Sequence, residues 1–409
     1  MSGLFLPQRR ALRFDSREVT PELTKAVVHL ASEIRSFGRV EKATERVLGR
    51  KVSTSTIRRL VKQVGQELAN RAEWPERSGG KQAVVPEIAV VSCDGGRIRT
   101  RKAGQGRGVP LSGETGWRET KNASFERMSS QEEFVPGEDS CPRLPTSFRS
   151  ANKVANIAEK PVPEGIETSG DAEEDRVIYE GPTRMLRTAV SSLSCSQDFG
   201  FTMRREADRR RFDEAEQRAV VGDGLNWNWS VWNTHFPNDT PILDFIHAIQ
   251  YVCKAALAMH DGEVDGWSDY VPFITWCWEG MVARVIDELT AFAQKRGVDL
   301  KEKRPDEDPH KPILDAIRYL SNNQNRMDSP RYRRDGLPVT SAPMESLIKQ
   351  INFRVQGTEM FWDDPERAEA ILHIRAAALS DDERLGDYLS HRPGWPFVRC
   401  STKLTTTVR

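Results

Sequence analysis

The stretch that decides the fold is residues 84–102, VVPEIAVVSCDGGRIRTRK. It begins with an apolar run of the kind found in a buried strand, and the run ends at Asp94, which Gly95 and Gly96 follow. Residues 97–101 then alternate as a second strand would. An Asp-Gly pair is also the commonest signal for a short hairpin turn. This stretch alone leaves two interpretations open: a plain turn, or a carboxylate placed at the end of a buried strand.

An apolar run closed by an acid occurs twice more along the chain. One run ends at Asp223, and PILDFIH at 241–247 places Asp244 after a third short strand. Much later, Glu345 lies near the start of a predicted helix. Like charges a few ångströms apart cannot all stay ionised without a cation, and Mg²⁺ prefers carboxylate oxygen. We therefore expect Asp94, Asp223 and Glu345 to converge on a divalent metal.

His247 follows the third predicted strand, on the first turn of the next helix. It is either an ordinary histidine at a helix start or a side chain that donates to Asp223, Asp244 or a scissile phosphate from beside the metal. Trp227 lies four residues beyond Asp223. Its ring either belongs to the core or stacks on an unpaired base.

The first 80 residues are basic and have helical spacing. They hold 16 Lys and Arg against 9 Asp and Glu, a surplus of 16 − 9 = 7. Three short helices are predicted, the third starting at Ser53 or Thr54 with one apolar face. We interpret them as a helix-turn-helix domain that binds double-stranded DNA, with a plain helical bundle as the alternative. The candidate DNA contacts of the third helix are Thr56, Arg58, Arg59 and Lys62.

Two segments read as insertions. Residues 131–175 hold 11 acids and 4 bases among Pro, Ser and Gly, which predicts an acidic disordered loop. Residues 253–335 have helical spacing throughout, which predicts an all-α insertion. Near its end, Arg331, Arg333 and Arg334 form either a solvated turn or a patch that follows DNA phosphates.

Several classes of protein and cofactor are excluded. No window of the chain has the roughly 18 apolar residues of a membrane span, and the N-terminus has no secretory leader. The six cysteines stand singly, which argues against a zinc site and for a reduced compartment. There is no GxxxxGK[ST], so no nucleotide cofactor is expected.

Several strings, taken in their order and spacing, resemble the ISKra-type bacterial insertion-sequence transposases, a branch of the DDE transposases with an RNase H-like catalytic domain. The resemblance covers residues 87–128 and 210–388. The strings are VVSCDGGRIRTR, WRETKNA, VVGDGLNWNW, HFPNDTPILDFIHA, TSAPMESLIKQINFRVQGTEMFW and EAILHIRAAALS. The resemblance implies that Asp94, Asp223 and Glu345 are a catalytic triad that holds two Mg²⁺ or Mn²⁺ ions. It also implies that Asp244 and His247 form a D-x-x-H element beside the triad.

The expected fold is α/β, an RNase H-like mixed sheet with helices, interrupted by an all-α insertion and preceded by the helix-turn-helix domain. The expected segments are the helix-turn-helix domain at 1–80, the catalytic core at 85–130, 176–252 and 336–395, the acidic insertion at 131–175, the all-α insertion at 253–335 and a tail at 396–409.

The expected activity is cleavage and strand transfer of DNA, at transposon ends and in target DNA, by a homodimer or larger synaptic assembly in the bacterial cytoplasm with the nucleoid. Two alternatives remain at this point. One is a non-catalytic DNA-binding protein of the same fold, and the other is a hydrolase that uses two carboxylates.

Overall fold

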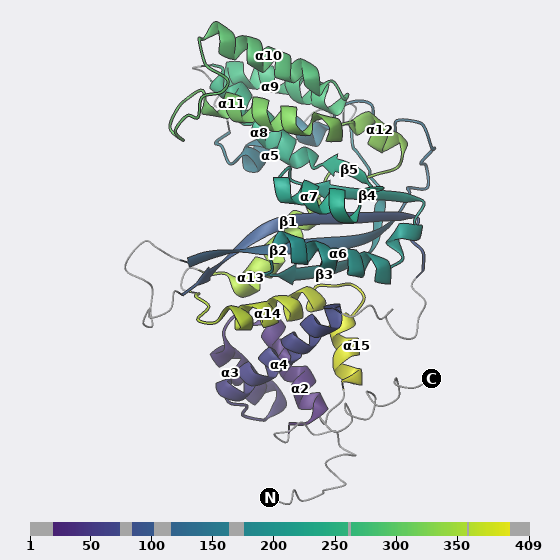
Figure 1. Ribbon diagram of the computed structural model, residues 1–409, viewed down its shortest axis with the longest axis vertical. Helices are drawn as coiled ribbons and strands as arrows, with labels where there is room; N and C mark the ends of the chain where they lie inside the picture. The colour runs from purple at the N-terminus through teal and green to yellow at the C-terminus, as the bar shows by residue number, and fades with distance from the viewer. Residues whose placement is uncertain are drawn as a thin grey trace, which may run out of the picture.

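A five-stranded mixed sheet forms the centre of the described part of the protein (Figure 1). The computed structural model describes residues 19–73, 84–101, 116–162, 176–260, 263–357 and 360–392. The strands lie in the order β3-β2-β1-β4-β5. β2 is antiparallel to β1 and β3, whereas β4 is parallel to both β1 and β5. The strands are β1 (Ile88–Thr100), β2 (Gly116–Ser129), β3 (Thr183–Ser192), β4 (Gln217–Gly222) and β5 (Thr240–Leu243). This mixed α/β architecture is compatible with the predicted RNase H-like fold.

The glycines after Asp94 do not form a turn, which corrects the expectation of two strands at 84–102. β1 continues through Asp94, Gly95 and Gly96 to Thr100, paired with β2 along its whole length. A Cβ on Gly96 would lie 2.5 Å from the hydroxyl of Thr120. The glycine is therefore needed for close packing inside the sheet and not for a reversal of the chain. The Gly-rich residues 103–113, predicted as a loop, lie outside the described residues.

One face of the sheet packs against a layer of helices drawn at the top of Figure 1. Alternate β1 residues such as Ile88 and Val90 share a core with α8 and with the helices that follow it. Trp278 is fully buried in this core. The helices are α5 (Ala151–Ala158), α8 (Phe245–Ala258), α9 (Glu263–Trp278), α10 (Val282–Lys295), α11 (Lys311–Asn323) and α12 (Ser329–Arg334), with short turns at Thr146–Phe148 and Gln324–Arg326. Every regular element in the described part of 253–335 is helical, as expected for that segment.

The acidic segment 131–175 differs from the prediction of a disordered loop. Its described part, 131–162, is ordered and contributes to the same core. Val154 and Ala158 of α5 are fully buried, and the ring of Phe148 lies 5.2 Å from that of Phe245. The few apolar residues of the segment are the ones that pack. Its glutamates within the described part are exposed, whereas the side chain of Asp139 is only 20% exposed. Residues 163–175 lie outside the described residues.

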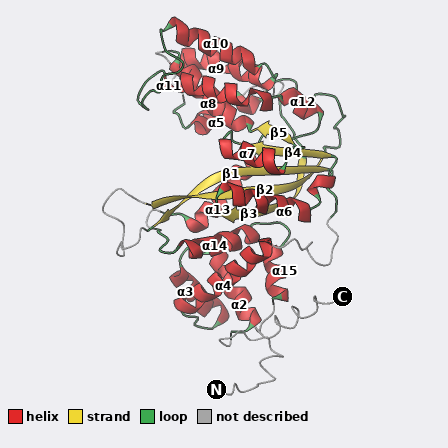
Figure 2. Cartoon of the chain, viewed as in Figure 1, coloured by secondary structure: helices red, strands yellow, loops and turns green. Residues whose placement is uncertain are grey.

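The opposite face is covered by α6 (Ser196–Arg209) and α7 (Asn226–His235), whereas α13 (Ala342–Val355) packs farther along the first face, on Ile98 of β1. With a turn at Phe212–Glu214, α6 and α7 pack on the β1 residues Ala89, Val91 and Cys93. The N-terminal helices are α2 (Pro21–Glu33), α3 (Phe37–Leu48) and α4 (Thr54–Glu73), and the C-terminal ones are α13 (Ala342–Val355), α14 (Pro365–Ala378) and α15 (Arg384–His391). These six share one core, at the bottom of Figure 1, so the N-terminal bundle is not packed independently (Figure 2).

The three predicted N-terminal helices are present, close to their expected bounds. Ser53 accepts a hydrogen bond from the backbone N–H of Thr56, and Gly49 ends α3 with a φ of 62°. The predicted apolar face of α4, with Ile57, Leu60 and Val64, is fully buried. The structure therefore has the helices that a helix-turn-helix requires, and DNA binding by them stays a prediction.

The cysteines agree with the expectation of isolated thiols. Cys93, Cys141, Cys253 and Cys277 are buried, Cys195 is exposed, and none of these five forms a disulfide. No helix within the described ranges has the length and apolar character that crossing a bilayer would require. Cys400 and the tail at 396–409 lie outside those ranges.

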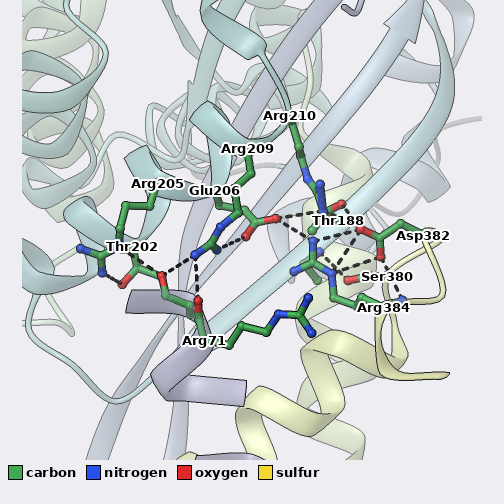
Figure 3. A network of polar contacts seen from close by, with 12 residues as sticks. Arg71, Thr188, Thr202, Arg205, Glu206, Arg209, Arg210, Ser380, Asp382 and Arg384 are labelled. Atoms are coloured by element: carbon green, nitrogen blue, oxygen red, sulfur yellow. Dashed lines mark hydrogen bonds and ion pairs between the residues drawn. The ribbon is translucent and has the colours of Figure 1, made fainter. Parts of the chain in front are cut away.

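A network of arginines and acids joins the N-terminal helices to the sheet (Figure 3). Arg205 and Arg209 of α6 donate to the last carbonyls of α4, where positive charge also suits the helix dipole. Glu206, whose side chain is 4% exposed, accepts from Arg209 at 3.0 Å, from Arg210 at 2.9 Å and from Arg384 at 2.6 Å. The labelled residues of the network are Arg71, Thr188, Thr202, Arg205, Glu206, Arg209, Arg210, Ser380, Asp382 and Arg384.

Removing the charge of Glu206 should destabilise the whole chain. We expect Glu206→Gln to lower the free energy of unfolding by about 3 kcal/mol, because three clustered guanidinium groups lose their buried counter-charge. Glu214→Gln is the matched control, since Glu214 pairs with Arg211 at the surface with 42% of its side chain exposed. The control should cost less than about 1 kcal/mol. Urea unfolding followed by circular dichroism measures both, and equal midpoints for the two variants would contradict the assignment.

Candidate active site

Three acids stand in one row across adjacent parallel strands, at the level where β4 and β5 end while β1 continues. The pairing places Cys93 beside Gly222 and Gly222 beside Leu243. The next residue on each strand is therefore Asp94, Asp223 or Asp244. Neighbouring strands are about 4.8 Å apart, so consecutive members of the row are close together.

Asp94 and Asp223 point to the same face of the sheet and interact. Burial is the main cause that raises the pKa of Asp94, to about 7, and the adjacent charge and hydrogen bond of Asp223 raise it further. The backbone N–H of Gly95, which donates to Asp94 Oδ1 at 2.5 Å, and the charge of His247 act in the opposite direction. Without a cation, this pair therefore keeps a proton near neutral pH.

Asp223 is held by the turn that it begins and by the helical layer. Its Oδ1 accepts from the backbone N–H of Leu225 at 3.0 Å and from Asn228 Nδ2 at 2.5 Å. Its backbone carbonyl accepts from Tyr319 of α11 at 2.8 Å, and a Cβ on Gly224 would lie 2.7 Å from that Tyr319 ring. Gly224, with a φ of +96°, is thus required both for the turn and for the approach of α11. The helical layer therefore fixes the position of this carboxylate.

Asp244 holds two helices in place and is fully buried. It caps α8 by accepting from the backbone N–H of Ile246 at 3.0 Å, and it accepts from the hydroxyl of Ser341. Ser341 precedes α13, so this bond joins the start of that helix to the end of β5. His247 lies beside the pair, with Nε2 3.9 Å from Asp244 Oδ2.

Glu345 lies on α13, which crosses the sheet between two fixed points. Ser341 is bonded to Asp244 at one end, and a Cβ on Gly96 would lie 3.4 Å from Asn352 at the other. Glu345 and Asn352 are seven residues apart and therefore on the same helix face. The Glu345 carboxylate is paired instead with Lys349 at 3.6 Å, and among the described residues no three His, Cys, Asp or Glu side chains are grouped to hold a metal. The structure brings Asp94 and Asp223 together and leaves Glu345 outside their cluster.

At least two of the four α4 residues expected to contact DNA form bonds to other residues of the chain. Lys62 forms an ion pair with Glu366 at 2.7 Å, at the start of α14. Thr56 is hydrogen-bonded to Ser53 at 3.0 Å. Arg58 is exposed, 5.9 Å from the ring of Phe37, and Arg59 is half-buried.

The basic loop before α13 divides into structural and exposed members. Arg333 is 1% exposed and donates to both carboxylate oxygens of Asp139 at 2.6 Å, and its guanidinium lies 4.2 Å from the centre of the Trp278 ring. The prediction that Arg333 contacts DNA is therefore wrong, because its guanidinium is buried and forms an ion pair with Asp139. Arg331 and Arg334 remain exposed.

Trp227 lies beside the site at the start of α7. Lys121 of β2 places its ammonium 4.3 Å from the centre of the Trp227 ring, and Nε1 of the indole has no hydrogen-bond partner. Sequence reasoning missed Lys121, Tyr319 and Asn228. Only Asn228 had a signal, because an Asn one helical turn beyond an acid can reach back to it, whereas the other two meet the site through tertiary packing.

The residues of the site fit a hard divalent cation. The donors of the row are carboxylate oxygens, which Mg²⁺ and Mn²⁺ prefer. Asp94 Oδ1 and Asp223 Oδ1 accept from N–H donors, and the two carboxylates also interact with each other. A cation bound between them would take the place of the proton that relieves their repulsion.

Comparisons with known proteins add little to this geometry. Among solved structures, the chain is similar to the Drosophila P element transposase strand transfer complex, with a TM-score of 0.35 and 10% sequence identity over 90% of this chain and 93% of that chain. A likeness of that degree does not support an assignment of fold or function. No protein-family model and no curated protein sequence matches the chain.

Binding of Mn²⁺ should depend on Asp94 and Asp223. We expect the metal, at a hundred-fold excess over its Kd, to stabilise the wild-type chain by about 2.7 kcal/mol in thermal unfolding. Asp94→Asn and Asp223→Asn should lose this effect, yet be at least as stable as the wild type in EDTA because the carboxylates no longer repel.

Asp198→Asn, a change at an exposed acid on α6, is the control and should respond to Mn²⁺ as the wild type does. A wild-type response in either site variant would contradict the assignment.

Proposed function

We propose that this chain is a DNA transposase of the DDE type, which cleaves phosphodiester bonds and joins strands with the help of divalent metal. The observation that carries the proposal is the interacting carboxylates of Asp94, inside β1, and Asp223, directly after β4, in a sheet of order β3-β2-β1-β4-β5. Helix α13, with Glu345, lies across that end of the sheet. The basic N-terminal helices suit a DNA substrate.

In this proposal each residue has a defined task. Asp94 and Asp223 would hold the ion, with Asn228 and the N–H groups of Gly95 and Leu225 keeping their carboxylates in position. Glu345 would join them after its side chain releases Lys349. Bound Mg²⁺ or Mn²⁺ supplies Lewis-acid activation of the attacking oxygen and neutralises charge at phosphorus.

The remaining side chains orient the site. Ser341 and Asp244 would fix the start of α13, and so the approach of Glu345. His247 would carry a proton or a hydrogen bond toward the scissile phosphate. Water as the attacking group gives cleavage, and a DNA 3′-hydroxyl in the same position gives strand transfer.

The test uses a duplex that ends in the inverted repeats flanking the coding region. We expect Mg²⁺-dependent nicking by the wild type, and a loss of more than about 100-fold in Asp94→Asn, Asp223→Asn and Glu345→Gln. This loss of nicking activity should be larger than the roughly 10- to 100-fold loss that follows when a residue that only hydrogen-bonds to a metal ligand is replaced. Lys349→Ala is the matched control for Glu345 and should keep activity.

DNA binding by each variant should remain as in the wild type, measured by fluorescence anisotropy. Binding without any metal-dependent nicking by the wild type would overturn the proposal, and would favour a non-catalytic DNA-binding protein. Full activity of Glu345→Gln would remove that residue from the triad.

A further inference from the structure

The outer halves of β1 and β2 form an arm that extends beyond the helices on either side (Figure 1). Residues paired across the two strands point to the same face. Arg99 is paired with Trp117, and Gly95 with Lys121. One face of the arm, which we call the arm face, therefore carries Arg97 and Arg99 of β1, with Arg101 directly after the strand, and Trp117, Glu119 and Lys121 of β2.

The arm face is the exposed side of the arm. On the other side, Ile98 is buried in a core with Leu347 and Ile351 of α13. On the arm face, Trp117 is 44% exposed and Arg97 is exposed. The apolar contacts of α6 and α7 on this side of β1 are with Ala89, Val91 and Cys93, and Trp227 of α7 also covers Lys121, which is 6% exposed. The part of the arm face that is open to a ligand is therefore the outer part, at Arg97 and Trp117.

Cations and aromatic rings alternate along the arm face. The Arg99 guanidinium lies 4.6 Å from the centre of the Trp117 ring and 5.8 Å from that of Phe361, and Arg101 lies 5.4 Å from the same Phe361 ring. At the base of the arm, Lys121 stacks on Trp227 at 4.3 Å. Each ring is thus held in place by a cation on one of its faces.

The charge of the arm face is positive, although that of the whole chain is zero. Its four cations are Arg97, Arg99, Arg101 and Lys121. Among the described residues, two acids pair with members of this set, Glu119 at 2.5 Å from Lys121 and Asp363 at 2.6 Å from Arg101, and Arg97 is exposed. The row from Gly95 to Arg101 spans six residue steps, or about 20 Å.

We propose that the arm face binds an unpaired DNA strand that comes from the active site. Asp94 and the arm face lie on opposite sides of the sheet, so the strand would pass around the edge of β1 beyond the point where its pairing with β4 ends at Cys93. Positive side chains match the phosphates, and an exposed indole offers a stacking surface that unpaired bases can use and the stacked bases of a duplex cannot. Trp227, four residues beyond Asp223, lies on the arm-face side of the sheet, against Lys121. The inference rests on the proposed function and deepens it, because it names the form of DNA that the protein holds beside the cut.

Binding of fluorescein-labelled oligodeoxythymidine by the full chain, measured by anisotropy in EDTA, tests the proposal without requiring activity. Trp117→Ala should weaken binding by roughly 5- to 150-fold, the range for the loss of one base–aromatic stack. Trp117→Phe should bind nearly as the wild type does. Arg97→Gln should reduce the slope of log K against log salt by about 0.7, the effect of one lost phosphate contact on single strands.

The chain offers a matched control pair. Arg284 lies 3.8 Å from the centre of the Trp276 ring on the helical layer, so Arg284→Gln and Trp276→Ala remove the same chemistry at a distance from the arm. Both controls should bind the oligonucleotide as the wild type does, and thermal unfolding confirms that the arm variants are folded.

Three results would overturn the proposal. They are no binding of the oligonucleotide by the wild type, unchanged binding by Trp117→Ala and Arg97→Gln, or an equal loss of duplex binding in Trp117→Ala. Asp94→Asn should still bind the oligonucleotide. If the wild type does not cleave the duplex but binds the oligonucleotide in a way that depends on Trp117 and Arg97, the proposed activity is wrong. The proposal that the arm face binds an unpaired strand would stand.

Discussion

The register of three parallel strands is the constraint on which the candidate site depends. Cys93, Gly222 and Leu243 are neighbours across β1, β4 and β5, so the acids that follow them fall into one row. A shift of one residue in any strand would turn its acid to the other face of the sheet. The two packed faces prevent that shift in β1 and β4, because each of these strands places alternate apolar residues in a different core.

The helical layers serve the site through a few specific contacts. Tyr319 of α11 reaches the carbonyl of Asp223, and Asp244 joins α8 to the start of α13 through Ser341. On the other side, α13 shares a core with the N-terminal helices, whose last turn is bound by arginines of α6. The region expected to bind DNA and the helix of Glu345 are therefore parts of one packed unit, although the sequence separates them by more than 250 positions.

Local chemistry could be predicted from the sequence and long-range packing could not. An acid that closes an apolar run predicts a strand end, which is correct for Asp223 and Asp244, whereas Asp94 lies inside β1. The run Asp94-Gly95-Gly96 was misread, because the glycines make room for Thr120 and not for a turn.

The interpretation of Arg333 failed for a related reason, since its partner Asp139 lies almost 200 residues away in a segment that composition marked as disordered. The position of the Glu345 carboxylate also depends on tertiary contacts that the local sequence does not show. Its helix was predicted, and the spacing to Lys349 is that of an ion pair within one helix, but nothing local indicates that Glu345 stays with Lys349 while Asp94 and Asp223 meet.

The most direct measurement is a crystal structure of the protein grown or soaked with Mn²⁺, with anomalous scattering recorded. The account predicts an anomalous peak between the carboxylates of Asp94 and Asp223, and none there in a crystal of Asp223→Asn. Anomalous density confined to other parts of the surface, with these two side chains in contact only with each other, would contradict it.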